Sequence, residues 1–366
     1  MDKRLRIVIP IYKFGKAGGN RVLSILANKW IEKGHSVCFV AAHNSDMPYF
    51  PTQAKIVWLD DAGSEIIKEH NATRKYSTMK SIMIIKKYLH SNHKNYDIAL
   101  ANFYLTAVAV YLSRINGKIY YIQAYEPEFY SWKNCGEIIQ KVISWCTYYF
   151  PLKRIVNANI YRKYKNLRSK YVIPPGLDLN VYYPKNRDPR KKGGFVIGCI
   201  GRKEEWKGTQ DVVESVRILH KQGYDIKFKV AFNSVDYDNY ELVEAHGDEK
   251  LAQFYRDLDI LVAPGHIQLG AVHYPVIEAM ACKTPVITTG YYPANTSNSY
   301  IVPIKRPDLI AQTIIEIMSN YAQAIYKSEI AYKEIKQFDW ELISQIFLDI
   351  FETELRRTEN DNSKKS

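Results

Sequence analysis

Short apolar runs alternate with segments of helical periodicity along the first half of the chain. The apolar runs predict buried strands and cover residues 5–11, 37–42, 56–59, 98–101 and 119–123. Residues 21–33 and 78–90 place apolar side chains three and four positions apart, which predicts helices, and the glycines within 15–20 predict a loop. This alternation is typical of βαβ units and a parallel, Rossmann-like sheet.

The same alternation restarts at Phe195. It predicts strands over 195–201, 226–231, 260–263 and 286–289, and helices over 209–221, 251–258 and 275–282. A second Rossmann-like unit therefore follows the first. An amphipathic segment at 340–355 predicts a final helix, and the polar residues after it predict a disordered end.

Residues 185–194 form a basic stretch with proline and glycine but no periodicity, which predicts a linker. The length of 366 residues also favours two domains. We therefore predict an α/β protein with an N-terminal domain at 1–184 and a C-terminal domain at 185–338. The helix at 339–357 is expected to return to the N-terminal domain, and residues 358–366 to form a disordered tail.

Composition narrows the class of protein. Hydrophobic residues make up 46% and charged residues 24% of the chain, which is typical of a soluble globular protein. No apolar run approaches the roughly 18 residues that a membrane-spanning helix needs, and the first apolar stretch is too short for a signal peptide. The five cysteines are odd in number and lack CxxC spacing, which favours reduced thiols and a cytoplasmic location.

The net charge of +13 is concentrated in the first half of the chain. Residues 1–184 carry 27 Lys and Arg against 12 Asp and Glu, a balance of +15, whereas the rest carries 24 against 26, a balance of −2. This asymmetry predicts an anionic partner. No nucleic-acid-binding motif accompanies the charge, so nucleic acid is not expected and anionic lipid headgroups fit better.

Segment 132–154 favours such a membrane contact, because its apolar residues recur at helical spacing beside lysines and Arg154. We expect peripheral association with the inner face of the cell membrane. The alternative is an amphipathic helix that packs on its own domain.

Two basic residues flank a predicted strand-to-helix connection of the second domain. Gly201 and Arg202 follow the strand, and Lys207 and Gly208 precede the helix at 209–221. A helix N-terminus attracts anions, Arg binds phosphate oxygens in pairs, and Lys adds a point charge. The connection is a candidate diphosphate site that needs no metal, although basic residues near a strand end are also common by chance.

The most specific segment is HYPVIEAMACKTPVITT at 273–289. Pro275 stands where a helix can start, because the missing N–H is not needed in the first turn. Glu278 follows within that turn, where a carboxylate is favoured and can bind a vicinal diol, as acidic residues bind ribose in Rossmann sites. The alternative for Glu278 is a helix-end charge without a ligand.

Together these segments resemble glycosyltransferase family 4, retaining sugar-nucleotide transferases with the GT-B fold. The resemblance covers nearly the whole chain, through GKAGGNR at 15–21, VIPPGLDLNVYYP at 172–184, IGCIGRKEEWKG at 197–208 and YPVIEAMACKTPVI at 274–287. It implies two Rossmann-like domains that face each other across a cleft. It also implies that Arg202 and Lys207 bind the donor diphosphate, that Glu278 binds the ribose, and that Gly18 and Gly19 approach the phosphates.

One position departs from the family pattern, which usually has a first Glu eight residues before the one matching Glu278. That position is Gly270 here, and Gln268 is expected to hydrogen-bond the sugar in its place. The departure indicates an unusual donor sugar, or a catalytically silent sugar-nucleotide- or glycan-binding protein of the same fold. The predicted substrate-binding residues are Gly18, Gly19, Gly201, Gln268, Gly270, Tyr274, Pro275, Val276 and Glu278.

Segment 120–130, YYIQAYEPEFY, follows a strand of the first domain and more weakly resembles bacterial rhamnosyltransferases of surface-glycan assembly. This resemblance implies dTDP-rhamnose as donor, with a UDP-sugar as the alternative, and a growing surface glycan or lipid-linked glycan as acceptor. Glu126, or else Glu128, is the candidate that orients the acceptor hydroxyl, so Glu126 joins Arg202 and Lys207 as a predicted catalytic residue. The alternative is that these carboxylates pair with nearby lysines.

No metal or other cofactor is expected. Asp-x-Asp pairs occur at 236–238 and 257–259, but two carboxylates at this spacing are frequent by chance. The second pair precedes a buried strand, whereas a Mg²⁺ site needs carboxylates that face the substrate phosphates. No pair of carboxylates for a glycosidase-like mechanism stands beside the donor loop. The family resemblance implies front-face displacement, in which the leaving phosphate accepts the acceptor's proton. A GT-B epimerase would need an acid/base set that the sequence does not show.

Overall fold

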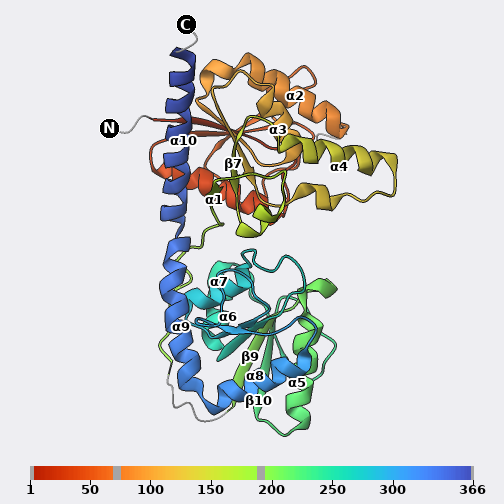
Figure 1. The fold of residues 1–366 in the computed structure, drawn as a ribbon, viewed down its shortest axis with the longest axis vertical. Helices are drawn as coiled ribbons and strands as arrows, with labels where there is room; N and C mark the ends of the chain where they lie inside the picture. The colour runs from red at the N-terminus through yellow and green to blue at the C-terminus, as the bar shows by residue number, and fades with distance from the viewer. Residues whose placement is uncertain (1–3, 69–75, 188–193, 364–366) are drawn as a thin grey trace. The chain divides into compact units, whose positions relative to one another are not determined.

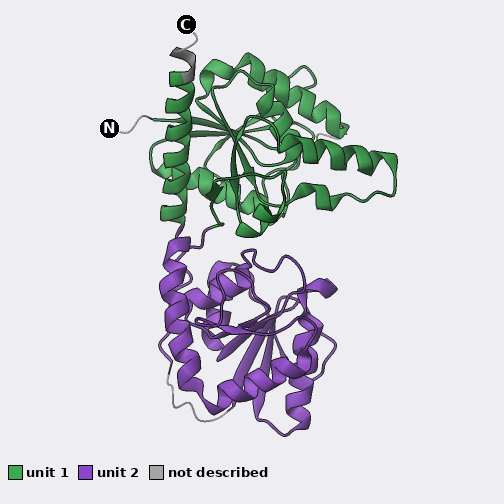
Figure 2. Ribbon diagram, in the orientation of Figure 1, with its two compact units in different colours: residues 1–175, 340–366 green, residues 176–339 purple. Residues whose placement is uncertain are grey.

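The structure is a computed structural model that describes residues 4–68, 76–187 and 194–363, without the side chains of 361–363. It contains two compact units, residues 1–175 with 340–366 (unit 1) and residues 176–339 (unit 2) (Figure 2). The sequence predicted the boundary at 184. The units divide earlier because Leu177 and Tyr182 are buried in the hydrophobic core of unit 2. The predicted linker at 185–194 lies mostly outside the described residues.

Unit 1 is built on an eight-stranded sheet with the order β4-β3-β2-β1-β5-β6-β7-β8 (Figure 1). Neighbouring strands are parallel except for the β3–β4 pair. In β1, Ile7 lies opposite Val37 of β2 and Ile98 of β5. The strands are β1 (Arg6–Pro10), β2 (Ser36–Ala42), β3 (Lys55–Leu59), β4 (Glu65–Ile66), β5 (Ile98–Ala101), β6 (Gly117–Ile122), β7 (Lys153–Val156) and β8 (Tyr171–Val172).

Two helices of unit 1 differ from the sequence prediction. The first helix begins at Gly18, so the predicted loop at 15–20 is shorter than expected. The third helix was not predicted, because YLTAVAVY is apolar on all sides and shows no helical period. The helices are α1 (Gly18–Glu32), α2 (Thr78–Ser91), α3 (Tyr104–Tyr111), α4 (Cys135–Thr147) and α10 (Trp340–Ser363), with 3-10 turns η1 (His93–Asn95), η2 (Glu126–Phe129) and η3 (Asn159–Lys163).

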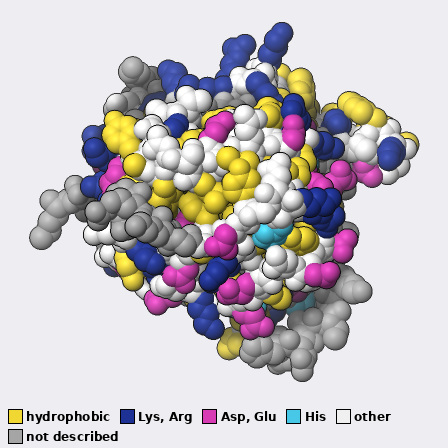
Figure 3. Space-filling view, turned by 90° about the horizontal axis from the view of Figure 1, so that it is seen from below, with side chains coloured by type: hydrophobic (Ala, Val, Ile, Leu, Met, Phe, Trp, Pro, Cys, Tyr) yellow, Lys and Arg dark blue, Asp and Glu magenta, His cyan; other side chains and the backbone are white. Residues whose placement is uncertain are grey.

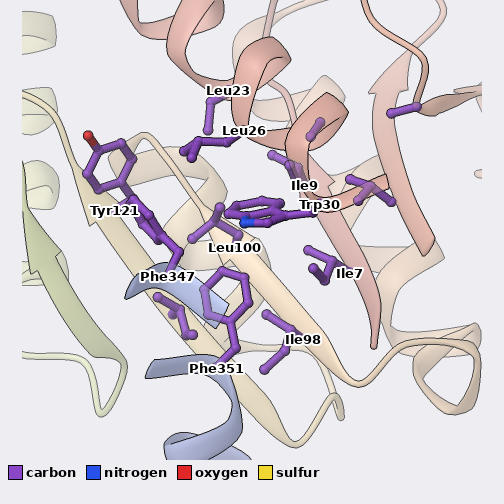
Figure 4. Close-up of a cluster of buried hydrophobic side chains, with 14 of the residues drawn as sticks. Ile7, Ile9, Leu23, Leu26, Trp30, Ile98, Leu100, Tyr121, Phe347 and Phe351 are labelled. Carbon is purple, nitrogen blue, oxygen red and sulfur yellow. The ribbon is translucent and has the colours of Figure 1, made fainter. Parts of the chain in front are cut away.

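The last helix, α10, completes the core of unit 1 (Figure 4). Trp30 of α1 is fully buried, and its ring centroid lies 5.8 Å from that of Phe347 and 5.2 Å from that of Phe351. Its indole N–H donates to the Ser344 carbonyl oxygen at 3.0 Å. Burying a side chain of this size contributes roughly 3 kcal/mol, which explains why a segment so late in the chain packs against α1 and β6.

The prediction of a disordered tail at 358–366 is wrong for most of its length, because α10 continues to Ser363. Ion pairs at helical spacing support this end: Glu352 pairs with Arg356 at 3.2 Å, and Glu354 with Arg357 at 3.0 Å. Residues 364–366 lie outside the described residues.

Unit 2 contains a fully parallel six-stranded sheet with the order β11-β10-β9-β12-β13-β14. The strand order reverses between β9 and β12, which is where ligands bind in open α/β sheets, outside the carboxyl ends of the strands. The strands are β9 (Phe195–Ile200), β10 (Ile226–Ala231), β11 (Glu241–Val243), β12 (Ile260–Ala263), β13 (Val286–Thr288) and β14 (Tyr300–Ile301). The helices are α5 (Thr209–Lys221), α6 (Asp248–Asp257), α7 (Tyr274–Ala281), α8 (Pro307–Ser319) and α9 (Tyr321–Ile335), with η4 (Glu205–Lys207) and η5 (Lys336–Phe338).

Candidate functional site

The loops that follow β9 and β12 enclose a small cavity of about 20 Å³ at the switch point of the unit 2 sheet. Its lining includes Arg202, Lys207, Thr209, His273 and Pro275. Thr209 begins α5, and Pro275 lies in the first turn of α7. The two predicted cations therefore share one cavity with two helix N-termini, which carry partial positive charge.

Two glycines let the 201–208 loop pass close to neighbouring backbone. A Cβ on Gly201 would lie 2.3 Å from the Asn233 carbonyl oxygen, and a Cβ on Gly208 would lie 2.1 Å from the Pro264 carbonyl oxygen. Gly208 also has a φ of 73°, a conformation that favours glycine. The Thr209 hydroxyl accepts a hydrogen bond from the Arg202 N–H at 3.0 Å. These contacts fix the backbone that carries the two cations.

The two cations act on each other. Arg202 is exposed, whereas Lys207 is half-buried. Burial lowers the pKa of Lys207, and the nearby charge of Arg202 lowers it further. A bound anion would raise the pKa of Lys207 again, because it replaces lost solvation and screens the repulsion between the two positive charges.

His273, at the N-cap of α7, also lines this cavity. Its ring stacks on Tyr291 with centroids 4.4 Å apart. Burial lowers its pKa to about 3, with further lowering from the charges of Lys207 and Arg202, so the imidazole is neutral at pH 7. The buried Nδ1 has no hydrogen-bond partner among the residues that the structure describes. A buried polar nitrogen without a hydrogen-bond partner destabilises the folded state unless a ligand pairs with it.

Glu278 lies on α7 three residues after Pro275, so both are on one face of the helix. Its side chain is 2% exposed, and its carboxylate accepts a hydrogen bond from the Tyr255 hydroxyl at 2.8 Å. The residues that line the cavity include Pro275 but not Glu278. The structure thus brings Arg202 and Lys207 together and holds Glu278 one helical turn away.

Val276 was predicted to bind substrate, but the structure uses this residue within unit 2. Its side chain is fully buried in the core of unit 2, and its N–H donates to the His273 carbonyl oxygen at 3.0 Å. Both groups are therefore used within the unit. Tyr274 packs partly buried against the same core.

The loop between β12 and α7 explains the departure from the family pattern in physical terms. Gly270 has a φ of 84° and Gln268 a φ of 55°, and the Ala271 N–H donates to the Gln268 carbonyl oxygen at 2.9 Å. A glutamate at position 270 would need the same left-handed backbone, which is unfavourable for residues with a Cβ. Gln268 is exposed, and neither residue is among those that line the cavity.

In unit 1, Gly18 and Gly19 form the first turn of α1 and not a free loop. A Cβ on Gly19 would lie 3.0 Å from the Gln123 side-chain amide, so a larger residue would displace that side chain. Ala17 precedes them at the N-cap and has no side-chain group that can cap the helix. The N–H groups of this turn therefore suit an anion.

Glu126 lies inside unit 1, which corrects its predicted contact with an acceptor. The side chain is 3% exposed, and the carboxylate accepts hydrogen bonds from the Tyr104 N–H and the Tyr120 hydroxyl, both at 2.8 Å. Tyr104 is the first residue of α3, so the carboxyl group caps that helix. Burial raises the pKa of Glu126 to about 8. Glu128 is exposed and accepts a hydrogen bond from the Tyr164 hydroxyl, not from a lysine.

The second DxD pair has structural partners. Buried Asp259 accepts a hydrogen bond from the Val196 N–H at 2.7 Å, and exposed Asp257 forms an ion pair with Lys185 at 3.8 Å. Across the described ranges, no group of three or more His, Cys, Asp or Glu side chains is arranged to hold a metal ion.

Comparison with known proteins finds glycosyltransferases that are similar to this part of the chain. Residues 194–320 match the family described as "Glycosyl transferases group 1". The chain is 28% identical over 216 residues to the "Probable sucrose-phosphate synthase" of Thermosipho melanesiensis, covering 52% of this chain and 49% of that protein. It is 27% identical over 224 residues to the capsular polysaccharide biosynthesis glycosyltransferase CapM of Staphylococcus aureus, covering 55% and 57%. The aligned part thus spans about half the length of these curated relatives.

Solved structures resemble nearly the whole chain. A sucrose-phosphate synthase from Thermosynechococcus elongatus superposes with a TM-score of 0.70 at 15% identity, covering 96% of this chain and 99% of that one. Anabaena HepE in complex with UDP and glucose gives a TM-score of 0.68 at 14% identity, covering 96% and 100%. At this identity the likeness shows the fold alone, and it confirms the predicted α/β architecture of two Rossmann-like units. The chain therefore has the GT-B fold, and residues 194–320 match the family described as "Glycosyl transferases group 1".

Proposed function

We propose that the protein transfers a sugar from a nucleotide-sugar donor to a glycan acceptor with retention of anomeric configuration. The observation that carries the proposal is that Arg202, Lys207 and the neutral His273 converge on one cavity at the switch point of unit 2. Cations and helix N-termini at such a point are suited to a diphosphate. The family match over residues 194–320 supports the same assignment.

The proposed mechanism rests on stabilising the leaving group. When the bond between the anomeric carbon and the phosphate oxygen breaks, negative charge grows on the diphosphate. Arg202 and Lys207 would meet this charge, and one preorganised donor of this kind contributes about 3 kcal/mol. His273 would donate a hydrogen bond from a neutral ring. We propose that these groups make a metal unnecessary.

Proton transfer is proposed to need no protein base. Glu126 is enclosed in unit 1, so it cannot take a proton from an acceptor. The acceptor hydroxyl would attack the face that the diphosphate leaves, and a phosphate oxygen would accept the proton. Glu278 would bind the ribose hydroxyls after exchanging its hydrogen bond from Tyr255.

The donor and acceptor are proposed from the relatives and from the sequence resemblance. HepE was solved with UDP-glucose, and CapM is named for capsular polysaccharide biosynthesis. We therefore propose a UDP-sugar or dTDP-rhamnose as donor. The proposed acceptor is a growing bacterial surface glycan or lipid-linked glycan.

Unit 1 is proposed to associate peripherally with an anionic membrane. Helix α4 exposes Ile139, Val142 and Trp145, which are 57%, 47% and 44% exposed, whereas it buries Ser144 and Thr147. Its apolar face is therefore not packed on its own unit. An exposed apolar face on a basic unit suits a lipid interface. Within the described ranges, no helix is long and apolar enough to span a bilayer.

A second candidate is a catalytically silent binding protein of the same fold. It is favoured by Gly270, whose left-handed backbone disfavours the carboxylate that the family pattern places there. Such a protein would bind a nucleotide sugar without turnover.

Donor screening and product analysis separate the two candidates. Thermal shifts with UDP-, dTDP- and GDP-sugars identify the donor, because a ligand that binds only the folded state raises the apparent stability. We expect turnover with that donor and its loss in Arg202→Ala. Donor binding without turnover would favour the silent protein, and an inverted anomeric carbon in the NMR spectrum of the product would contradict retention.

A further inference from the structure

A groove of about 800 Å³ lies in unit 1 beside β7 and β8. Seven of its thirteen lining residues are Lys or Arg, and none of the thirteen is Asp or Glu. By contrast, Lys and Arg side chains are interspersed with Asp and Glu on the face shown in Figure 3. The cations of the groove include Lys153, Arg154, Arg162, Lys165, Arg168 and Arg357. A concave surface with charge of one sign concentrates ions of the opposite sign.

Most of this charge is left uncompensated. Lys153 and Arg357 pair with the buried carboxylate of Glu354, at 3.4 and 3.0 Å. Arg162 and Arg168 form no ion pair with any residue that the structure describes. The groove therefore holds positive charge that an external anion would neutralise.

Arg154 indicates the chemistry of that anion. Its guanidinium donates to the Tyr148 carbonyl oxygen, but its buried Nε has no hydrogen-bond partner among the described residues. Burial lowers the pKa of Arg154, and the charge of Arg168 lowers it further. An anion with several acceptor oxygens in the groove would offset the repulsion between the guanidinium groups of Arg154 and Arg168. Phosphate matches the geometry of guanidinium groups in this way.

The groove lies at the opposite ends of the strands from the usual ligand sites of such sheets. Lys153 begins β7 and Tyr171 begins β8, and the two strands are parallel. The groove is therefore at the amino ends of these strands, whereas substrates of open α/β sheets bind at the carboxyl ends. It is a site separate from the proposed transfer chemistry.

We propose that this groove binds phosphate groups, and that anionic lipid headgroups supply them. The C-terminal end of α4, the helix that carries the exposed apolar side chains, adjoins the groove within unit 1, because the Asn166 amide donates to the Trp145 carbonyl oxygen at 3.5 Å and Arg154 donates to Tyr148, the residue after α4. The residues that would insert into the lipid and the groove that would bind the headgroups are thus neighbours in unit 1. The headgroup as the source rests on the membrane association proposed above, whereas the phosphate site rests on the groove alone.

The test compares vesicle binding of the full chain and of Arg162→Gln/Arg168→Gln. Anionic vesicles of phosphatidylcholine mixed with phosphatidylglycerol are compared with vesicles of phosphatidylcholine alone. Each basic residue at an anionic surface contributes about fivefold in affinity, so we expect the double variant to bind anionic vesicles roughly 25-fold more weakly. The matched control is Lys86→Gln/Lys87→Gln on α2, which removes the same charge elsewhere in unit 1.

Two further arms identify the source of the phosphate. Titration calorimetry with inorganic pyrophosphate is run on chains that carry Arg202→Ala/Lys207→Ala, because the cavity of unit 2 would also take a diphosphate, and it then reports on the groove without a membrane. In the other arm, Ile139→Ser/Val142→Ser removes apolar contacts of α4 while leaving the groove intact. We expect the α4 variant to lose vesicle binding and to keep pyrophosphate binding. If the groove variant loses pyrophosphate binding but keeps vesicle binding, the site takes a soluble phosphate compound and the headgroup is overturned.

The proposal as a whole is overturned if the groove variant and the α2 control do not differ in either assay. Circular dichroism checks that each variant is folded. The thermal shift with a nucleotide sugar reports on unit 2, so its persistence in the groove variant separates a failure of this proposal from a failure of the proposed transferase function.

Discussion

The buried carboxyl group of Glu126 makes the stability of unit 1 depend on pH in a direction that can be measured. Glu126 is enclosed by Tyr104, Tyr120 and Tyr148. Burial raises its pKa from 4.5 to about 8. The folded protein therefore keeps this proton between pH 4.5 and 8, whereas the unfolded chain has lost it. Because the folded state binds more protons in this range, its stability falls as the pH rises.

The substitution Glu126→Gln removes this dependence, because glutamine keeps the shape and a hydrogen-bond acceptor but does not ionise. A pKa moved from 4.5 to about 8 corresponds to about 5 kcal/mol, at 1.36 kcal/mol for each pH unit. The variant should therefore gain up to about 5 kcal/mol on the wild type between pH 4.5 and pH 8. The gain should be absent below pH 4.5.

The assay is urea unfolding of both proteins at half-unit steps from pH 4.5 to 8.5. The matched control is Glu128→Gln, which makes the same change at an exposed residue of the same 3-10 turn, and which should follow the wild type. A constant difference between Glu126→Gln and the wild type across the range would contradict the raised pKa, because it would show that Glu126 is already ionised in the folded state at pH 4.5.

Three further predictions concern unit 2. Gly208→Ala should destabilise it by more than Gly223→Ala in urea unfolding, because both have positive φ but only the first Cβ meets a backbone oxygen, at 2.1 Å; equal losses would mean that the contact with Pro264 is unimportant. Lys207→Met should weaken nucleoside diphosphate binding about 10- to 100-fold in calorimetry, the contribution of a charged hydrogen bond, whereas exposed Lys203→Met should leave it nearly unchanged. Because the pKa of His273 is lowered to about 3, the pH dependence of this binding between pH 5 and 8 should come from the ligand's own phosphate, whose second pKa is about 6, and should be the same in His273→Phe; a step that disappears in His273→Phe would contradict a neutral ring.

Strands and helices could be predicted from the sequence where the apolar side chains that they bury follow a regular spacing. The strands at 98–101, 226–231 and 260–263 and the helix at 209–221 lie at the predicted residues, because short apolar runs and a 3.6-residue period report burial directly. Helices α8 and α9 were missed, although Ile310, Ile314 and Ile317 of α8 have helical spacing and are buried. That signal was present in the chain. The C-terminal end of α10 was harder to predict, because its charged residues show no regular spacing of apolar side chains.

The candidate site was predictable only in part, for a related reason. Arg202 and Lys207 stand in a strand–loop–helix pattern that places both at one anion site. The enclosure of Glu126 depends on tyrosines from α3, β6 and the residue after α4, and local patterns do not reveal such a convergence. The burial of the His273 Nδ1 without a partner likewise depends on how two loops fold, so it could not be predicted from the sequence.

Binding of nucleoside diphosphates in the presence of EDTA shows whether Arg202 and Lys207 hold a diphosphate without a metal ion. We predict that one of UDP, dTDP and GDP binds the wild-type chain without metal. Arg202→Ala/Lys207→Ala should weaken that binding by at least about 100-fold, since each charged hydrogen bond contributes about 1.5–3 kcal/mol. Affinity that is unchanged in the double variant, or that appears only when a divalent cation is added, would contradict a metal-free diphosphate site at these two residues.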